Sequence, residues 1–134
     1  MKTARDVLAD VKRENVQFIK LWFVDILGVL KSFTITQREL EGGLSEGMGF
    51  DGSSIEGFAR IFESDLIAKP NPETYVILPW RTQEEKVARM FCDILNPDGT
   101  HYDGDTRYIL KKNLDEAKKL GLTFNVGPEL EYFY

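Results

Sequence analysis

Two glutamates near the end of the chain, Glu129 and Glu131, have the type and spacing of a metal-ligating pair. Positions two apart share one face of a strand, so both carboxylates would project the same way, roughly 6.6–7 Å apart along it. Carboxylates this close repel each other unless water screens them or a positive partner lies between them. Ligands that are all oxygen suit Mg²⁺ or Mn²⁺ rather than Zn²⁺. The pattern also fits an ordinary solvent-facing strand face, because short patterns recur by chance.

A second candidate is Asp51, which stands next to Gly52 and two hydroxyl residues, Ser53 and Ser54. A carboxylate presented on a loop can hold a cation or accept a proton from an amine. An Asp-Gly-Ser sequence is also typical of a turn in which the side chain satisfies its own backbone. Spacing alone leaves both interpretations open.

The single histidine and the single cysteine exclude other kinds of site. His101 has no second histidine to work with, so a His-rich metal site or a His-based triad cannot form within the chain. Cys92 cannot form an intrachain disulfide, and its apolar neighbours Met90 and Phe91 indicate a buried, inert thiol. This cysteine usage predicts a reduced, cytoplasmic compartment.

The overall composition is that of a soluble globular protein, with 43% hydrophobic and 29% charged residues. The net charge of -5, the sequence pI of about 4.9 and the lack of any basic run argue against a nucleic-acid partner. No hydrophobic signal core and no apolar stretch of membrane-spanning length occurs in the sequence, so we expect no membrane partner.

Hydrophobic periodicity and turn residues predict a small α+β domain followed by the start of another. Helices are expected over 6–15, with Thr3 or Asp6 as the cap, over 37–44, and over 106–120, ended by Gly121. Strands are expected over 16–26 and 29–36, joined as a hairpin, and over 66–68, 75–78, 87–95, 122–126 and 130–134. Residues 48–65 show no hydrophobic periodicity and are predicted to form a long loop. Long loops in compact domains often contain functional residues.

The change in character near residues 102–105 predicts a domain boundary, dividing the chain into 1–103 and 104–134. The sequence ends on Tyr132, Phe133 and Tyr134, inside the last expected strand. Chain termini are usually solvated and polar, so we expect the second domain to be truncated here.

Four segments together resemble the glutamine synthetase family, in its bacterial and archaeal form (type I). FDGSSIEGF at 50–58, followed by ESD at 63–65, is similar to the aspartate loop of that family. GPELEYF at 127–133 is similar to its first metal-binding strand. FVDILG at 23–28 and FCDI at 91–94 also stand where the family has comparable segments.

The resemblance implies a β-grasp N-terminal domain over 1–103 and an incomplete catalytic domain over 104–134. It implies ATP-dependent ligation of ammonia to L-glutamate through γ-glutamyl phosphate, at sites shared between neighbouring subunits of a homododecamer of two stacked hexameric rings. Asp51 and Ser53 would act in the site of the neighbouring subunit, where Asp51 helps to bind and deprotonate ammonium. Glu129 and Glu131 would each ligate one of two Mg²⁺ or Mn²⁺ ions.

Two positions qualify this resemblance. Phe58 stands where some bacterial relatives have tryptophan. Phenylalanine keeps the aromatic ring but lacks the hydrogen-bond donor of tryptophan. Arg60 resembles an arginine connected with product feedback in one subclass, and is a candidate regulatory residue.

Two rival functions remain at this stage. A glutamine synthetase-like ligase that joins glutamate to a polyamine or another amine would use the same metals, although Asp51 with Ser53 favours ammonia. A non-catalytic β-grasp binding module is the other rival, and the abrupt end at Tyr134 speaks against it.

Overall fold

A computed structural model of the chain describes residues 1–54, 65–82 and 84–134. The elements in chain order are α1 (Ala4–Arg13), β1 (Phe18–Val24), β2 (Leu30–Thr36), α2 (Leu40–Glu46), β3 (Met48–Asp51), the 3₁₀ turn η1 (Gly52–Ser54), β4 (Asp65–Pro70), the 3₁₀ turn η3 (Pro72–Thr74), β5 (Val76–Ile77), β6 (Val87–Leu95) and α3 (Thr106–Lys119). The mixture of a sheet with α-helices confirms the predicted α+β class.

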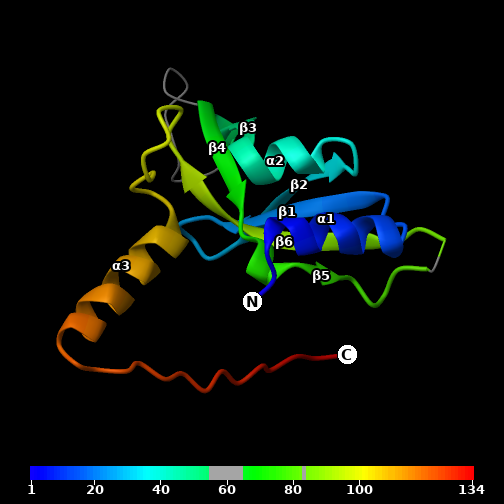
Figure 1. Cartoon of the computed structure of the whole chain (residues 1–134). Helices are drawn as coiled ribbons and strands as arrows, with labels where there is room; N and C mark the ends of the chain where they lie inside the picture. The colour runs from blue at the N-terminus through cyan, green and yellow to red at the C-terminus, as the bar shows by residue number, and fades with distance from the viewer. Residues whose placement is uncertain (55–64, 83) are drawn as a thin grey trace.

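The strands form one mixed sheet in the order β2-β1-β6-β4-β3, and β5 also pairs with β6 (Figure 1). The central strands β1 and β6 run parallel, with Phe18 opposite Val87 and Trp22 opposite Phe91. The other paired strands are antiparallel. The part of the chain from α1 to β6 is called the sheet domain below.

The hydrophobic core lies between one face of the sheet and the helices α1 and α2. Alternate residues of β1 and β6 point into it, because successive strand residues face opposite sides. The helices add their apolar stripes to the same cluster. Its members include Val7 and Val11 of α1, Leu40 and Leu44 of α2, Ile19, Leu21 and Phe23 of β1, and Met90, Cys92 and Ile94 of β6.

The first helix begins where a capping box fixes it. The Thr3 hydroxyl accepts a hydrogen bond from the backbone N–H of Asp6 at 3.2 Å, and the Asp6 carboxylate accepts one from the backbone N–H of Thr3 at 2.8 Å. Lys12 and Arg13 lie in the last turn, where cations interact favourably with the helix dipole. The predicted helix is confirmed, and Thr3 is the cap.

The predicted hairpin of β1 and β2 is also confirmed, and Asp25 builds its turn. The Asp25 Oδ1 atom accepts hydrogen bonds from the backbone N–H groups of Leu27 at 3.0 Å and Val29 at 2.8 Å. Gly28 takes a positive φ of 83°, which glycine adopts without strain. Lys31 Nζ lies 3.4 Å from the Asp25 Oδ2 atom. The side chain of Asp25 therefore closes the turn. Only 1% of the residue is exposed, and these contacts compensate for its burial.

The predicted loop over 48–65 is wrong at both ends. Met48–Asp51 forms β3, which pairs antiparallel with β4, and β4 starts at Asp65. The alternation of Met48 and Phe50 with Gly49 and Asp51 extends over only four residues, and β3 is held by its pairing with β4. Residues 55–64 of the predicted loop lie outside the described residues.

The third helix, α3, confirms the helix predicted over 106–120. Asp105 caps its first turn, and Gly121 follows its end with a φ of 72°. None of its residues is buried. In Figure 1 α3 projects away from the sheet domain.

The strand predicted over 122–126 and 130–134 is absent from this structure. Residues 122–134 form no helix or strand, and their side chains are exposed. A strand is held by hydrogen bonds to a neighbouring strand, and no strand among the described residues pairs with this segment. Local sequence preference alone therefore does not make a strand here.

None of the helices in the described part of the chain is both long and apolar enough to cross a membrane.

Candidate functional site

Asp51 is the last residue of β3 and is followed by η1 and then by residues 55–64. Its Oδ1 atom accepts a hydrogen bond from the backbone N–H of Ser53 at 2.9 Å and another from the Ser53 hydroxyl at 2.6 Å. The structure therefore contains the Asp-Ser turn that was one of the two interpretations of this sequence. Asp51 is nevertheless an exposed residue, so the turn fixes a surface carboxylate in one orientation.

Aromatic packing holds this turn in place from the preceding residue. The Phe50 ring lies 5.1 Å from the ring of Phe23 and 5.8 Å from the ring of Phe33, measured between centroids. These distances are typical of favourable aromatic pairs. Because Phe23 belongs to β1 and Phe33 to β2, the turn at Asp51 is tied to the hairpin.

A glycine at position 47 allows β3 to reach β4. A Cβ atom added to Gly47 would lie 2.4 Å from Ile67 Cγ2, and the residue has a φ of 88°. Both the close contact and the backbone conformation exclude larger residues without a shift of the chain. The placement of Asp51 therefore depends on Gly47 as well as on Phe50.

The register of β3 with β4 places a second acid at the same position. Asp65 is the ladder partner of Asp51, and both are exposed. The sequence analysis did not pair these residues, because it treated 48–65 as a loop. The signal that could have found the pair is the alternation of Met48 and Phe50 with small or polar residues.

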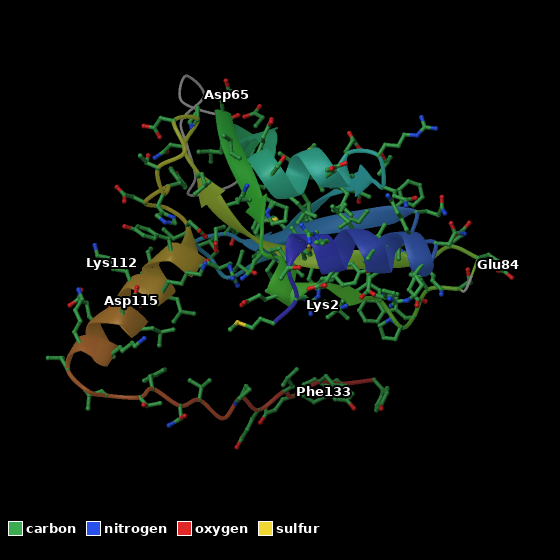
Figure 2. The ribbon with its side chains drawn as sticks, viewed as in Figure 1. Lys2, Asp65, Glu84, Lys112, Asp115 and Phe133 are labelled. Carbon is green, nitrogen blue, oxygen red and sulfur yellow. The ribbon has the colours of Figure 1, made fainter. Side chains whose placement is uncertain are left out.

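The other predicted site residues do not join Asp51 and Ser53. Glu129 and Glu131 lie on the exposed segment after α3, which Figure 2 shows below the sheet domain, with Phe133 labelled on it. Asp51, in contrast, ends β3, which Figure 1 shows across the sheet domain from the C-terminal segment. Arg60 and Phe58 lie outside the described residues.

The carboxylates of Glu129 and Glu131 fit a divalent metal ion in donor type but not in number. Mg²⁺ prefers oxygen ligands, and two carboxylates can fill only part of a shell of about six. Within the described part of the chain, no group of three or more His, Cys, Asp and Glu residues could hold a metal ion. Further ligands would have to come from water or from other residues.

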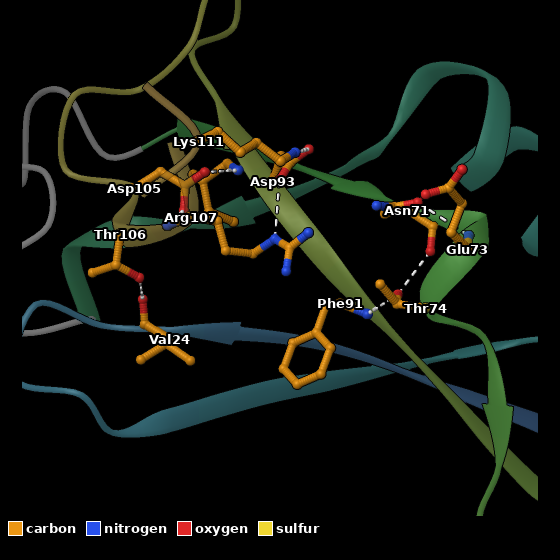
Figure 3. A network of polar contacts seen from close by, with 11 residues as sticks. Val24, Asn71, Glu73, Thr74, Phe91, Asp93, Asp105, Thr106, Arg107 and Lys111 are labelled. Carbon is orange, nitrogen blue, oxygen red and sulfur yellow. Dashed lines mark hydrogen bonds and ion pairs between the residues drawn. The ribbon is translucent and has the colours of Figure 1, made fainter. Parts of the chain in front are cut away.

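A polar joint links α3 to the sheet domain, and the sequence analysis missed it (Figure 3). Asp105, only 1% exposed, accepts hydrogen bonds from the backbone N–H groups of Ile94 and Arg107, both at 3.0 Å. Burial raises the pKa of Asp105, although these two N–H groups act in the opposite direction. The position of Asp105 just before a predicted helix was the available signal, because aspartate is a common helix cap.

Asp93 forms the second part of this joint. Its carboxylate lies 3.0 Å from Arg107 Nε and 2.5 Å from Lys111 Nζ. Burial alone would raise the pKa of Asp93, but the Lys111 and Arg107 cations outweigh it and lower the pKa. Asp93 is therefore held as an anion between two residues of α3.

The buried position predicted for Cys92 is confirmed. Cys92 is buried in the core of β6, and burial raises the pKa of its thiol to about 12. His101 is exposed and stacks on Tyr108, with ring centroids 4.4 Å apart.

Comparison with known proteins identifies the family. Residues 15–97 match the family model described as glutamine synthetase, beta-Grasp domain. The chain belongs to the glutamine synthetase β-grasp family. The parallel centre of the sheet and its two covering helices are thus the expected β-grasp domain, and the predicted family and fold class are confirmed.

Curated proteins from two bacteria and an archaeon are similar to this glutamine synthetase β-grasp chain. It is 51% identical over 129 residues to the glutamine synthetase of Mycolicibacterium smegmatis, covering 95% of this chain and 29% of the relative. It is 51% identical over 131 residues to that of Clostridium saccharobutylicum, covering 98% and 30%. The Methanosarcina mazei glutamine synthetase is 49% identical over 131 residues, with coverage of 98% and 29%. The chain thus spans less than a third of the length of these relatives.

Solved structures support the fold. The glutamine synthetase of Plasmodium falciparum, determined by cryo-electron microscopy, aligns with a TM-score of 0.80 at 22% identity, covering 90% of this chain and 23% of the other. Ligand-free GmaS aligns with a TM-score of 0.77 at 24% identity, covering 86% and 26%. At these identities the likeness concerns the fold alone.

Proposed function

We propose that this chain is the N-terminal part of a glutamine synthetase, which ligates ammonia to L-glutamate with ATP and forms L-glutamine, ADP and phosphate through γ-glutamyl phosphate. One observation carries the proposal. About half of the residues are identical to glutamine synthetases of both bacteria and an archaeon over 95–98% of this chain. Residues 1–103 would be the N-terminal β-grasp domain, and 104–134 the start of the catalytic domain.

In this proposal Asp51 binds ammonium and accepts a proton from it. A carboxylate can accept a proton from an amine, and Ser53 holds that of Asp51 in one orientation by two hydrogen bonds. A fixed base needs no reorganisation when the substrate arrives. Since Asp51 and the Glu129–Glu131 segment lie apart within the chain, Asp51 would act in the site of a neighbouring subunit.

Glu129 and Glu131 would provide ligands to the two divalent cations, Mg²⁺ or Mn²⁺. When bound, such ions neutralise the charge that develops on the transferred phosphoryl group of ATP. The carboxylates themselves would bind and orient the ions. Arg60, on the same segment as Asp51 in sequence, would contribute to regulation by the product.

A site shared between subunits requires an oligomer. The relevant assembly would be a homododecamer of two stacked hexameric rings, in which each contact between neighbours within a ring is heterologous and the ring closes. The enzyme would work in the cytoplasm.

The decisive experiment is an activity assay on the full-length protein that carries this chain. We expect glutamine and phosphate to form from L-glutamate, ammonium, ATP and Mg²⁺. Replacing ammonium by putrescine tests the rival amine ligase, which would prefer the polyamine. The 134-residue chain alone is expected to be inactive, because two glutamates do not complete a metal site.

Two variants test the metal residues in the same assay. Glu131→Ala is expected to abolish synthesis, and Glu129→Ala is expected to act chiefly on the ion nearer the nucleotide. The matched control is Glu116→Ala on α3, an exposed carboxylate that pairs only locally with Lys119. Near-normal activity of both variants at limiting Mg²⁺ would show that the pair is an ordinary polar face.

A further inference from the structure

The direction in which α3 leaves the sheet domain is set by a small number of polar contacts. Among the described residues, these contacts come from the cap and the first two turns of the helix. Asp105 joins Ile94 to Arg107, Asp93 binds Arg107 and Lys111, and the Thr106 hydroxyl donates to the backbone oxygen of Val24 at 3.2 Å. Figure 3 shows these groups gathered at the ends of β6 and β1.

Apolar packing does not fix this direction. No residue of α3 is buried, and Ile109, Leu110 and Leu114 are exposed. Hydrophobic contact is non-directional, whereas hydrogen bonds weaken steeply when their angles change. The orientation of α3 therefore rests on the polar joint and on the stacking of Tyr108 against His101, with ring centroids 4.4 Å apart.

The chemistry of Asp105 exceeds what a helix cap needs. One side-chain oxygen is enough to cap a helix, and a serine would supply it. Asp105 uses its Oδ1 atom for Arg107 and its Oδ2 atom for Ile94. The second oxygen connects the helix to the central strand β6.

The helix acts as a lever on the residues that follow it. Its 14 residues span about 21 Å at 1.5 Å per residue, so a tilt of about 10° would move the far end by about 4 Å. A misplacement of about 1 Å can cost a catalytic site about 100-fold in rate. Glu129 and Glu131 come after this far end, on a segment without secondary structure.

We propose that Asp105 and Asp93 are positioning residues, which set the direction of α3 against the sheet domain and thereby the placement of Glu129 and Glu131 relative to that domain. The second half of this inference rests on the proposed function. The first half concerns the geometry of the chain and is tested independently of any activity.

The geometric test uses the 134-residue chain with spin labels at Lys12→Cys on α1 and Lys118→Cys on α3. Both positions are exposed, and buried Cys92 does not take the label. Pulsed electron double resonance then measures the distribution of distances between the labels. We compare Asp105→Ser, which keeps the cap and loses the contact with Ile94, and Asp93→Asn, which weakens both ion pairs. The control is Thr3→Ala, which removes the cap of α1 instead.

The expected result is a single narrow distribution in the unaltered chain and in Thr3→Ala. In Asp105→Ser, in Asp93→Asn and in the double variant, the distribution should become at least twice as wide or shift by several ångströms. Circular dichroism establishes that each variant is folded, and if Asp105→Ser unfolds, Asp93→Asn alone serves as the test. An unchanged distribution in the folded variants would overturn the proposal.

The catalytic test uses the full-length protein. Asp105→Ser is expected to lower kcat by about 10-fold to 100-fold, with KM for ATP changed less than about 3-fold. Thr3→Ala, at a similar loss of Tm, should keep its kcat. If the labels move and kcat does not, the joint sets the helix but has no positioning role in catalysis. If the unaltered protein makes no glutamine, the proposed function fails, while the label distances still decide the role of the joint.

Discussion

Asp51 and Asp65 face each other across the ladder of β3 and β4, at the point where the described chain enters and leaves segment 55–64. Like charges directly opposite each other in an antiparallel pair destabilise it. The two strands must therefore hold this pair together against its own repulsion. Aromatic packing of Phe50 against Phe23 and Phe33 helps to hold β3 in place next to this pair.

Removing one of these charges should stabilise the fold slightly. We expect Asp65→Asn to raise the free energy of unfolding at pH 7 by roughly 0.2–1 kcal/mol, the usual range for cross-strand pairs. Urea unfolding measures the difference, with Asp103→Asn, an exposed acid outside the ladder, as the control. A loss of stability at pH 7 would show that Asp65 has a favourable partner instead.

The shared site predicts complementation between two inactive variants. Full-length Asp51→Ala and Glu131→Ala proteins are each expected to be nearly inactive as uniform oligomers. After dissociation and random equal reassembly, about a quarter of the sites would combine an intact loop with an intact metal segment. Glutamine formation by the mixed rings measures this recovery. Background activity in verified mixed rings would mean that both residues serve the site of their own subunit.

The turn at Asp25 should make stability depend on acid pH. Burial alone would raise the pKa of Asp25, but hydrogen bonds from Val29 and Leu27 and the Lys31 cation outweigh it, and the pKa is lowered. A carboxyl group with a lowered pKa in the fold stabilises it above the ordinary pKa of aspartate, and this contribution is lost as the pH falls through the lowered value. Asp25→Ala should therefore lower Tm by several degrees at pH 7, and the difference should shrink toward pH 2. An equal difference at both pH values would show that the charge of Asp25 contributes nothing.

The buried thiol of Cys92 should be almost unreactive in the folded chain. With a pKa of about 12, the thiolate fraction at pH 8 is roughly 10³-fold below that of an ordinary cysteine. We expect a colorimetric disulfide reagent to titrate one thiol in guanidinium chloride and none on the same timescale in buffer. Rapid reaction in buffer would show that β6 opens readily to solvent.

Local signals were enough to predict much of the fold. Thr3 and Asp6 indicated the start of α1, and Gly28 with its apolar neighbours indicated the hairpin. Contacts between distant segments were not predictable in this way. β3 exists because it pairs with β4, while the strand predicted at the C-terminal end lacks a partner among the described residues and does not form.

The candidate site divides in the same manner. The Asp51–Ser53 turn is a contact between neighbours in sequence, and it was one of the two predicted possibilities. The burial of Asp25 and Asp105 could not be read from residue type, because aspartate is usually exposed and is buried only where hydrogen bonds compensate. The roles of Glu129 and Glu131 depend on neighbours in space, so the sequence can suggest them only by resemblance.

The parallel pairing of β1 with β6 has a consequence for how this protein acquires its structure during synthesis. Phe18 can pair only after Val87 has been synthesised. The centre of the sheet therefore cannot form until almost the whole β-grasp domain has left the ribosome. Until then the hairpin of β1 and β2 has one edge without its parallel neighbour, and the apolar residues of β1 are open to solvent. Nascent chains in this state are prone to aggregate and are the natural clients of molecular chaperones. Slow translation between residues 40 and 90 would therefore lengthen the time during which the nascent chain can aggregate.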